Sequence, residues 1–165
     1  MSKFGLLVAT TCVAALAFAG PPALAQSKNK QHASTTTTQT PAKKAHRLVL
    51  QVNSADPAMM NLALNNASNV EQYYKDLGEK VDIEIVTFGP GLHMLREDTS
   101  PVKDRIKAIA EKSKAISFKA CGNTQANMAK AEDKPIELIP EASVVKSGVV
   151  RVIELQEQGW SYVRP

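Results

Sequence analysis

The chain has 165 residues and a formal net charge of +4 at pH 7. Its positive charge is uneven, because five of the 20 Lys and Arg residues but none of the 16 Asp and Glu residues precede His46. The remaining part is therefore nearly neutral, and with one Trp and no basic-aromatic stripe it gives no support for nucleic-acid binding. Its length suffices for one domain with a single buried core.

The N-terminus has the pattern of a secretory signal peptide. Lys3 supplies positive charge, an uncharged, mostly apolar run spans residues 4–18, and Ala23-Leu24-Ala25 offers small residues for cleavage. The run is shorter than the ~20 residues that a membrane-spanning helix needs. We expect a signal peptide at 1–25, cleavage after about Ala25, a periplasmic location and no membrane span in the mature chain.

Residues 26–45 are rich in Ser, Thr, Gln and Lys and contain no acid. Such a segment buries too little apolar surface to offset its ordering entropy, so we expect a disordered tether. Its lysines could contact an anionic membrane or cell wall, although a solubilising spacer is the simpler interpretation. The folded domain is expected at 46–165.

Strands and helices are predicted to alternate along that domain. A strand at 48–52 is followed by Asp56-Pro57, an N-cap with proline at the first helical position. Apolar residues then recur at spacings of three and four up to Leu77, and Gly78 ends the helix. A second strand is expected at 81–88, near the sheet edge, because Asp82 and Glu84 alternate with apolar residues.

The second half repeats this pattern. A short helix is expected at 92–96, and Ser100-Pro101 predicts the start of another helix. Further strands are expected at 116–120, 136–139 and 160–163, with helices at about 124–131 and from Ser147 to near Gly159. Such strand-helix units predict one three-layer α/β domain with a mainly parallel five-stranded sheet and helices on both faces.

Ligands of such sheets bind beyond the carboxyl ends of the strands, where the strand order reverses. Three loops follow strands in the predicted fold, and all three are candidate ligand sites. Their candidate ligand-binding residues are Asn53, Asp56, Gly89, Gly91, Gly122, Asn123 and Thr124.

Cys121 is the first catalytic candidate. After signal cleavage it is the only cysteine, so it has no partner for an internal disulfide. A buried, inert thiol is one interpretation. The other is a poised thiolate, because the free N–H groups of a helix start lower a thiol pKa.

His93 is the second catalytic candidate, because its glycine turn could present it to Cys121 as an activating base. A solvent-facing loop histidine is the alternative. No metal site is expected, since Cys121, His93 and His46 lack metal-ligand spacing. No cofactor is expected either, because the turn at 89–91 lacks the length and the lysine of a phosphate-binding loop.

Asparagines form a polar stripe on the first long helix, at Asn61, Asn65 and Asn69. Asparagine is a poor helix former, so the stripe has a cost in helix propensity. It is either a wetted face or a contact surface, in which the amides bind a loop or a second subunit.

Several segments in order resemble the DsrE/DsrF-like family. They include the strand followed by Asn53-Ser54-Ala55-Asp56, the turn Gly89-Pro90-Gly91-Leu92 and the segment Ala120-Cys121-Gly122-Asn123-Thr124, and the likeness spans residues 46–165. The resemblance implies a compact α/β fold assembled as homo-oligomers, trimers or hexamers. It also implies sulfur relay, with a persulfide on Cys121 and a sulfur donor or acceptor protein as partner.

The leading hypothesis is thus a periplasmic sulfur-handling protein, at most a sulfurtransferase-type carrier, that holds sulfane sulfur on Cys121. The alternative is a non-catalytic oligomeric module that binds a small ligand or a partner, with a structural Cys121. A thiol redox protein is a third hypothesis, disfavoured because no resolving cysteine is present.

Overall fold

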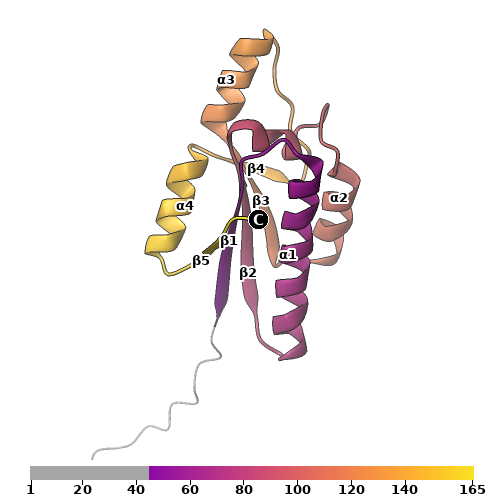
Figure 1. The fold of residues 1–165 in the computed structure, drawn as a ribbon, viewed down its shortest axis with the longest axis vertical. Helices are drawn as coiled ribbons and strands as arrows, with labels where there is room; N and C mark the ends of the chain where they lie inside the picture. The colour runs from indigo at the N-terminus through magenta and orange to yellow at the C-terminus, as the bar shows by residue number, and fades with distance from the viewer. Residues whose placement is uncertain (1–44) are drawn as a thin grey trace, which may run out of the picture. The chain divides into compact units, whose positions relative to one another are not determined.

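The computed structural model describes residues 45–165, so the predicted signal peptide and all of the predicted tether except Ala45 lie outside the described residues. The described strands form one five-stranded sheet in which every neighbouring pair is parallel. Helices connect the strands (Figure 1), which confirms the predicted α/β fold with its parallel sheet. The elements are β1 His46–Val52, α1 Pro57–Asp76, β2 Val81–Thr87, the 3₁₀ helix η1 Gly89–Leu95, α2 Lys103–Lys112, β3 Ile116–Cys121, α3 Gly122–Glu132, β4 Ala142–Val145, α4 Gly148–Glu157 and β5 Ser161–Val163.

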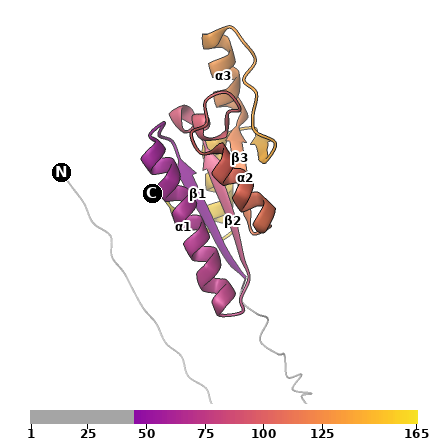
Figure 2. The same ribbon diagram turned by 90° about the vertical axis from the view of Figure 1, so that its right-hand side faces the viewer.

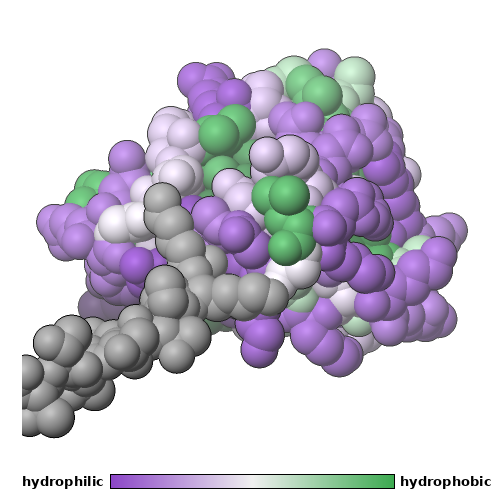
Figure 3. Space-filling view, turned by 90° about the horizontal axis from the view of Figure 1, so that it is seen from below, coloured by the Kyte–Doolittle hydropathy of each residue, from purple (hydrophilic) through white to green (hydrophobic). Residues whose placement is uncertain are grey.

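The strand order is β4-β3-β2-β1-β5, so the order reverses between β1 and β5. Helices α1 and α2 lie on one face of the sheet and α4 lies on the other (Figures 1 and 2). Helix α3 extends beyond the carboxyl ends of the strands, at the top of Figure 1. Seen from the opposite end, the described surface is mostly hydrophilic with small, separate hydrophobic patches (Figure 3).

Most of the hydrophobic core lies between the sheet and α1. Asp56 starts this helix as predicted, since its carboxylate accepts the N–H of Ala58 at 2.8 Å. Met60, Ala63 and Leu64 are fully buried in the main core, which also contains Phe118. Each large aliphatic side chain buried in this way contributes about 1.5–3 kcal/mol. A smaller core beneath α4 consists of Val49, Val86, Val152 and Leu155.

The edge position predicted for the second strand is wrong, because β2 is the central strand of the five. Its alternating charges have another cause. Asp82 is exposed, whereas Glu84 is 8% exposed and accepts two hydrogen bonds from Arg151 of α4, at 2.9 and 2.5 Å. An ion pair with the covering helix therefore keeps a carboxylate inside a central strand.

The strand predicted at 136–139 is also wrong, because β4 comprises Ala142–Val145. Ile136 and Ile139 are buried, but they lie in the loop before β4. The start predicted for the next helix also needs correction, because α2 begins at Lys103 rather than at Ser100-Pro101.

Candidate functional site

Cys121 lies at the junction of β3 and α3. It is the last residue of the strand and the N-cap of the helix, with an extended backbone (φ −73°, ψ 114°). Its side chain is largely covered, with 5% of the residue exposed, and it is the free cysteine of the described residues. Of the three candidate loops, this one places a nucleophilic atom at the carboxyl end of the sheet.

The starts of two helices converge on the sulfur of Cys121. The backbone N–H groups of Asn123 and Thr124, from the first turn of α3, favour the charged form of the sulfur, and the N–H of Asn123 also donates to the carbonyl oxygen of Lys146 at 3.2 Å. The N–H of Gly148, the first residue of α4, donates a hydrogen bond to the sulfur. Helix N-termini carry partial positive charge, so this arrangement favours a negatively charged sulfur.

The Thr124 hydroxyl connects the second candidate loop to the third. Its oxygen accepts the N–H of Gly89 at 3.0 Å, and the same hydroxyl hydrogen-bonds with the sulfur of Cys121. The Gly89 N–H is a donor, so it leaves the hydroxyl proton of Thr124 available to the sulfur. Thr124 therefore acts as a donor toward Cys121, and a donor stabilises a thiolate.

These contacts determine the direction of the pKa shift of Cys121. Burial is the largest single influence and raises the pKa of the thiol. The hydrogen bonds from the Thr124 hydroxyl and from the N–H groups of Gly148, Thr124 and Asn123 act in the opposite direction, and together they hold the pKa below its ordinary value. A thiol with a lowered pKa is ionised in a larger fraction of molecules at neutral pH, and the thiolate is the nucleophilic form.

Two glycines are required by close packing around the site. A Cβ on Gly148 would lie 2.8 Å from Cδ1 of Phe88 and 3.2 Å from Cβ of Cys121. A Cβ on Gly91 would lie only 2.1 Å from the carbonyl oxygen of Val52. Gly148 thus lets α4 approach the cysteine, and Gly91 lets η1 pack against the end of β1.

An open hollow of about 550 Å³ lies beside these helix starts. It contains Asn123 from the first turn of α3 and the loop that leads into α4. Lys146 and Arg151 bring positive charge to it, and Glu154 brings one negative charge. The lining residues are Asn123, Val145, Lys146, Ser147, Val150, Arg151 and Glu154. The hollow offers space for a small anion near the partners of Cys121.

His93 is engaged elsewhere in the structure. Its Nδ1 lies 2.8 Å from Oγ1 of Thr99, and the contacts described for Cys121 within residues 45–165 do not include His93. The predicted cysteine-histidine pair therefore has no hydrogen bond in this structure, and an acid-base role for His93 stays a prediction.

The first candidate loop lies at the reversal of strand order, away from Cys121. Asp56 is an exposed helix cap, and Asn53 lines a hollow of about 30 Å³ next to the C-terminal Arg164 and Pro165. This hollow has room for about one water molecule. The larger space and the thiol lie at β3 and β4 instead. Among residues 45–165, no group of three or more His, Cys, Asp or Glu side chains is arranged to hold a metal ion.

The asparagine stripe has an internal partner. The guanidinium of Arg105, on α2, donates to the side chain of Asn61 at 2.7 Å and to that of Asn65. These amides therefore connect α1 to α2 within one chain. The predicted subunit contact of Asn61, Asn65 and Asn69 stays a prediction, and Asn69 lines a separate pocket.

Arg96 anchors the far end of α3. Its side chain is 1% exposed and makes paired hydrogen bonds to Asp98 (2.9 and 2.8 Å) and to Glu132 at the end of α3 (2.5 and 2.8 Å). The guanidinium lowers the pKa of Glu132 to about 2. None of the residues described in α3 is buried, so this ion pair is one of the few contacts that hold the helix in place.

Sequence reasoning missed Gly148, although it donates directly to the sulfur. The reason is the misplaced fourth strand. A strand at 142–145 puts residues 146–148 at the carboxyl end of the neighbour of β3, beside Cys121. The available signal was Ser147-Gly148, a helix start that follows Val144-Val145 after one intervening residue, Lys146.

Comparison with known proteins supports the fold. No family model matches the chain, and no curated protein matches it. A solved structure of a protein of unknown function, MTH1491 from Methanobacterium thermoautotrophicum, is similar, with 28% sequence identity and a TM-score of 0.62. The match covers 73% of this chain and 99% of that one. Membership of the DsrE/DsrF-like family stays a prediction.

Proposed function

We propose that this protein handles sulfur in the periplasm and carries sulfane sulfur as a persulfide on Cys121. The observation that carries the proposal is the convergence of two helix starts and the Thr124 hydroxyl on one sulfur atom. The persulfide that forms carries its negative charge on the outer sulfur, one S–S bond from Sγ, and the positive ends of the two helices favour negative charge there as well. The described residues contain no second cysteine, which favours sulfur transfer over disulfide exchange.

The proposed step is a nucleophilic displacement. The thiolate of Cys121 attacks the outer sulfur of thiosulfate, a new S–S bond forms, and the S–S bond of the donor breaks. The bonding electron pair leaves with sulfite, so Cys–S⁻ and S–SO₃²⁻ become Cys–S–S⁻ and SO₃²⁻. An acceptor nucleophile then takes the outer sulfur and returns Cys121 to the thiolate. Lys146 lines the adjacent hollow and supplies positive charge that attracts an anionic donor, whereas the charge of Arg151 there is balanced by Glu84.

The alternative function is a non-catalytic oligomeric module with a structural Cys121. Two observations favour it. Cys121 is only 5% exposed, so a donor has little direct access to the sulfur. Large apolar side chains near this end of the domain are about half exposed, namely Val144, Val149, Val150 and Ile153. A surface of this kind is typical of protein contacts, including those between copies of one chain.

Intact-mass spectrometry after incubation with thiosulfate or a polysulfide separates the two functions. We expect a mass gain of one sulfur that a reducing agent reverses and that Cys121→Ala abolishes. Thr124→Val should slow the gain, whereas Thr124→Ser, which keeps the hydroxyl, should not. A Cys121 that stays unmodified by both donors, but reacts with a thiol reagent after unfolding, would exclude the carrier and leave the binding module.

A further inference from the structure

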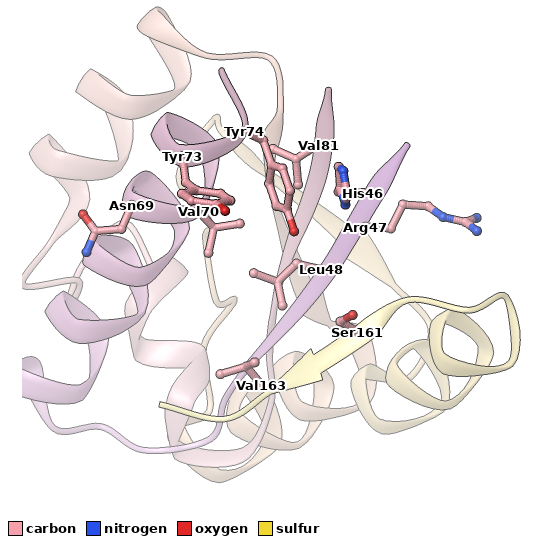
Figure 4. Close-up of a pocket in the computed structure, with 10 residues that line it drawn as sticks. All are labelled: His46, Arg47, Leu48, Asn69, Val70, Tyr73, Tyr74, Val81, Ser161 and Val163. Atoms are coloured by element: carbon pink, nitrogen blue, oxygen red, sulfur yellow. The ribbon is translucent and has the colours of Figure 1, made fainter. Parts of the chain in front are cut away.

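A second pocket lies at the opposite end of the sheet from the cysteine. Its volume is about 350 Å³, and it lies between the C-terminal half of α1 and the strands β1 and β5 (Figure 4). His46 and Val81 open β1 and β2, so this is the end where these strands begin. The lining residues are His46, Arg47, Leu48, Asn69, Val70, Tyr73, Tyr74, Val81, Ser161 and Val163.

The topology explains why this pocket exists. Strand β5 pairs with β1, with Ser161 next to Leu48 and Val163 next to Leu50. Leu48 and Leu50 belong to the main core under α1, so Ser161 and Val163 face the same side of the sheet. Helix α1 lies over β1 and β2 but leaves the edge strand uncovered (Figure 1). Val163 is therefore 41% exposed although it continues an apolar surface.

Aromatic rings form the upper wall of the pocket. The rings of Tyr73 and Tyr74 meet edge to face, with centroids 5.3 Å apart and planes at 79°. The ring of His46 stacks on Tyr74 at 3.7 Å, which holds Tyr74 in position. Both tyrosine hydroxyls point toward the space above Leu48, and the Ser161 hydroxyl lies across from them (Figure 4). The pocket thus combines apolar walls with uncharged hydrogen-bonding groups.

Charge in the described lining is either paired or directed away. Nε2 of His46 lies 2.6 Å from a carboxylate oxygen of Glu79. The guanidinium of Arg47 points away from the pocket (Figure 4). A charged ligand would give up its hydration here without gaining an opposite charge, which is costly. A neutral ligand incurs no such cost.

We propose that this pocket binds a small neutral aromatic molecule of one or two rings that carries a hydroxyl or amide group. The volume is near the lower end of the range of ~300–1,000 Å³ that small-molecule sites occupy. Perpendicular tyrosine rings suit a planar guest, which can stack on one ring while it meets the edge of the other. The tyrosine and serine hydroxyls can each donate a hydrogen bond to its polar group or accept one from it.

Naphthol and naphthoate are matched probes, because they share the ring system and differ in charge at neutral pH. Each probe is titrated into the purified, naturally processed protein, and calorimetry of the titration gives the two affinities. We expect saturable binding of naphthol at one site per chain and at least ~10-fold weaker binding of naphthoate, the loss of about 1.4 kcal/mol or more. Equal affinities, preference for naphthoate, or no saturable binding of naphthol would overturn the proposal.

Two neighbouring substitutions locate the site. Ser161→Trp fills the pocket, whereas Tyr162→Trp alters the adjacent residue, whose hydroxyl bonds Gln51 on the other side of the sheet at 2.9 Å. We expect Ser161→Trp to weaken naphthol binding at least ~10-fold and Tyr162→Trp to leave it unchanged. If Ser161→Trp does not fold, Val163→Glu at a half-exposed position serves the same purpose. Equal effects of the pocket variant and Tyr162→Trp would refute the location.

Discussion

Replacing Thr124 by valine removes the hydroxyl that connects the two loops and keeps the shape of the side chain. The change deletes the hydrogen bond to the sulfur of Cys121 and leaves the Gly89 N–H, 3.0 Å from Oγ1, without its acceptor. An intramolecular hydrogen bond contributes about 0.5–1.5 kcal/mol, and an unsatisfied buried donor costs about 1–3 kcal/mol. Because Thr124 is only half-buried, we expect Thr124→Val to lower the free energy of unfolding by about 1–2 kcal/mol.

The same substitution should raise the pKa of Cys121. In the native chain that pKa lies below its ordinary value, so the unfolded state holds more protons between the folded and the unfolded pKa. Stability therefore rises with pH across this window, and this contribution is lost as the pH falls through the folded pKa. Thr124→Val should flatten the rise, because the Thr124 hydroxyl is the first of the groups that lower the pKa.

Thiolate absorbance against pH measures the pKa of Cys121. Urea unfolding at several pH values measures the free energy of unfolding and its rise with pH. Thr124→Ser is the matched control, because it keeps the hydroxyl and should titrate like the native protein. The reasoning would be refuted if Thr124→Val left the titration of Cys121 unchanged. It would also fail if Thr124→Ser raised the pKa as much as Thr124→Val.

Three further predictions concern the supports of the site. Gly148→Ala should lower the free energy of unfolding by about 1–3 kcal/mol, measured in urea, because its methyl group would lie 2.8 Å from Phe88; native-like stability would contradict this close packing. Arg96→Met should destabilise the protein at neutral pH, but the difference should shrink as the pH falls through about 2, where Glu132 binds its proton and only the hydrogen bonds to Asp98 remain. A deficit that is constant in urea titrations from neutral to acid pH would speak against this ion pair. Arg105→Met should lower the free energy of unfolding, measured in urea, by about 1 kcal/mol, because the hydrogen bonds from Arg105 to α1 are lost. Lys107→Met, at an exposed position of the same helix, should leave the free energy of unfolding nearly unchanged.

The sequence allowed prediction of the fold where local signals and burial agree. Asp56-Pro57 marks the start of α1 unambiguously, and the strand run ending at Val52 is buried as a central parallel strand should be. The fourth strand shows the limit. Ile136 and Ile139 are buried, with exposed fractions of 5% and 2%. Burial in a packed loop, however, leaves the same sequence pattern as burial in a strand. The real β4 has only four residues, Ala-Ser-Val-Val, with a half-buried and exposed pattern, so its apolar run is too short to stand out as a strand.

The candidate site was predictable only in part, for a related reason. Cys121 could be placed at a strand end from its own segment, since Phe118 and Ala120 define β3. Its contact with Gly148 depends on which strand neighbours β3, and that is a property of the whole sheet. The bond between Thr124 and Gly89 likewise joins loops 35 residues apart in sequence. No local pattern encodes such contacts.

Helix α3 has a consequence for the timing of events at the sulfur. None of its residues is buried in the core. Hydrogen bonds of Thr124, Gln125, Met128 and Glu132 connect it to the rest of the domain. Such a segment opens locally at a lower free energy than the sheet, so its amides should exchange with deuterium well before those of β1 to β3. Each opening removes two of the N–H donors from Cys121 and exposes the sulfur. Access to a covered thiol and loss of its stabilisation are thus the same motion, and the ion pair of Arg96 with Glu132, about 16 Å away along the helix, is one of the contacts that oppose it.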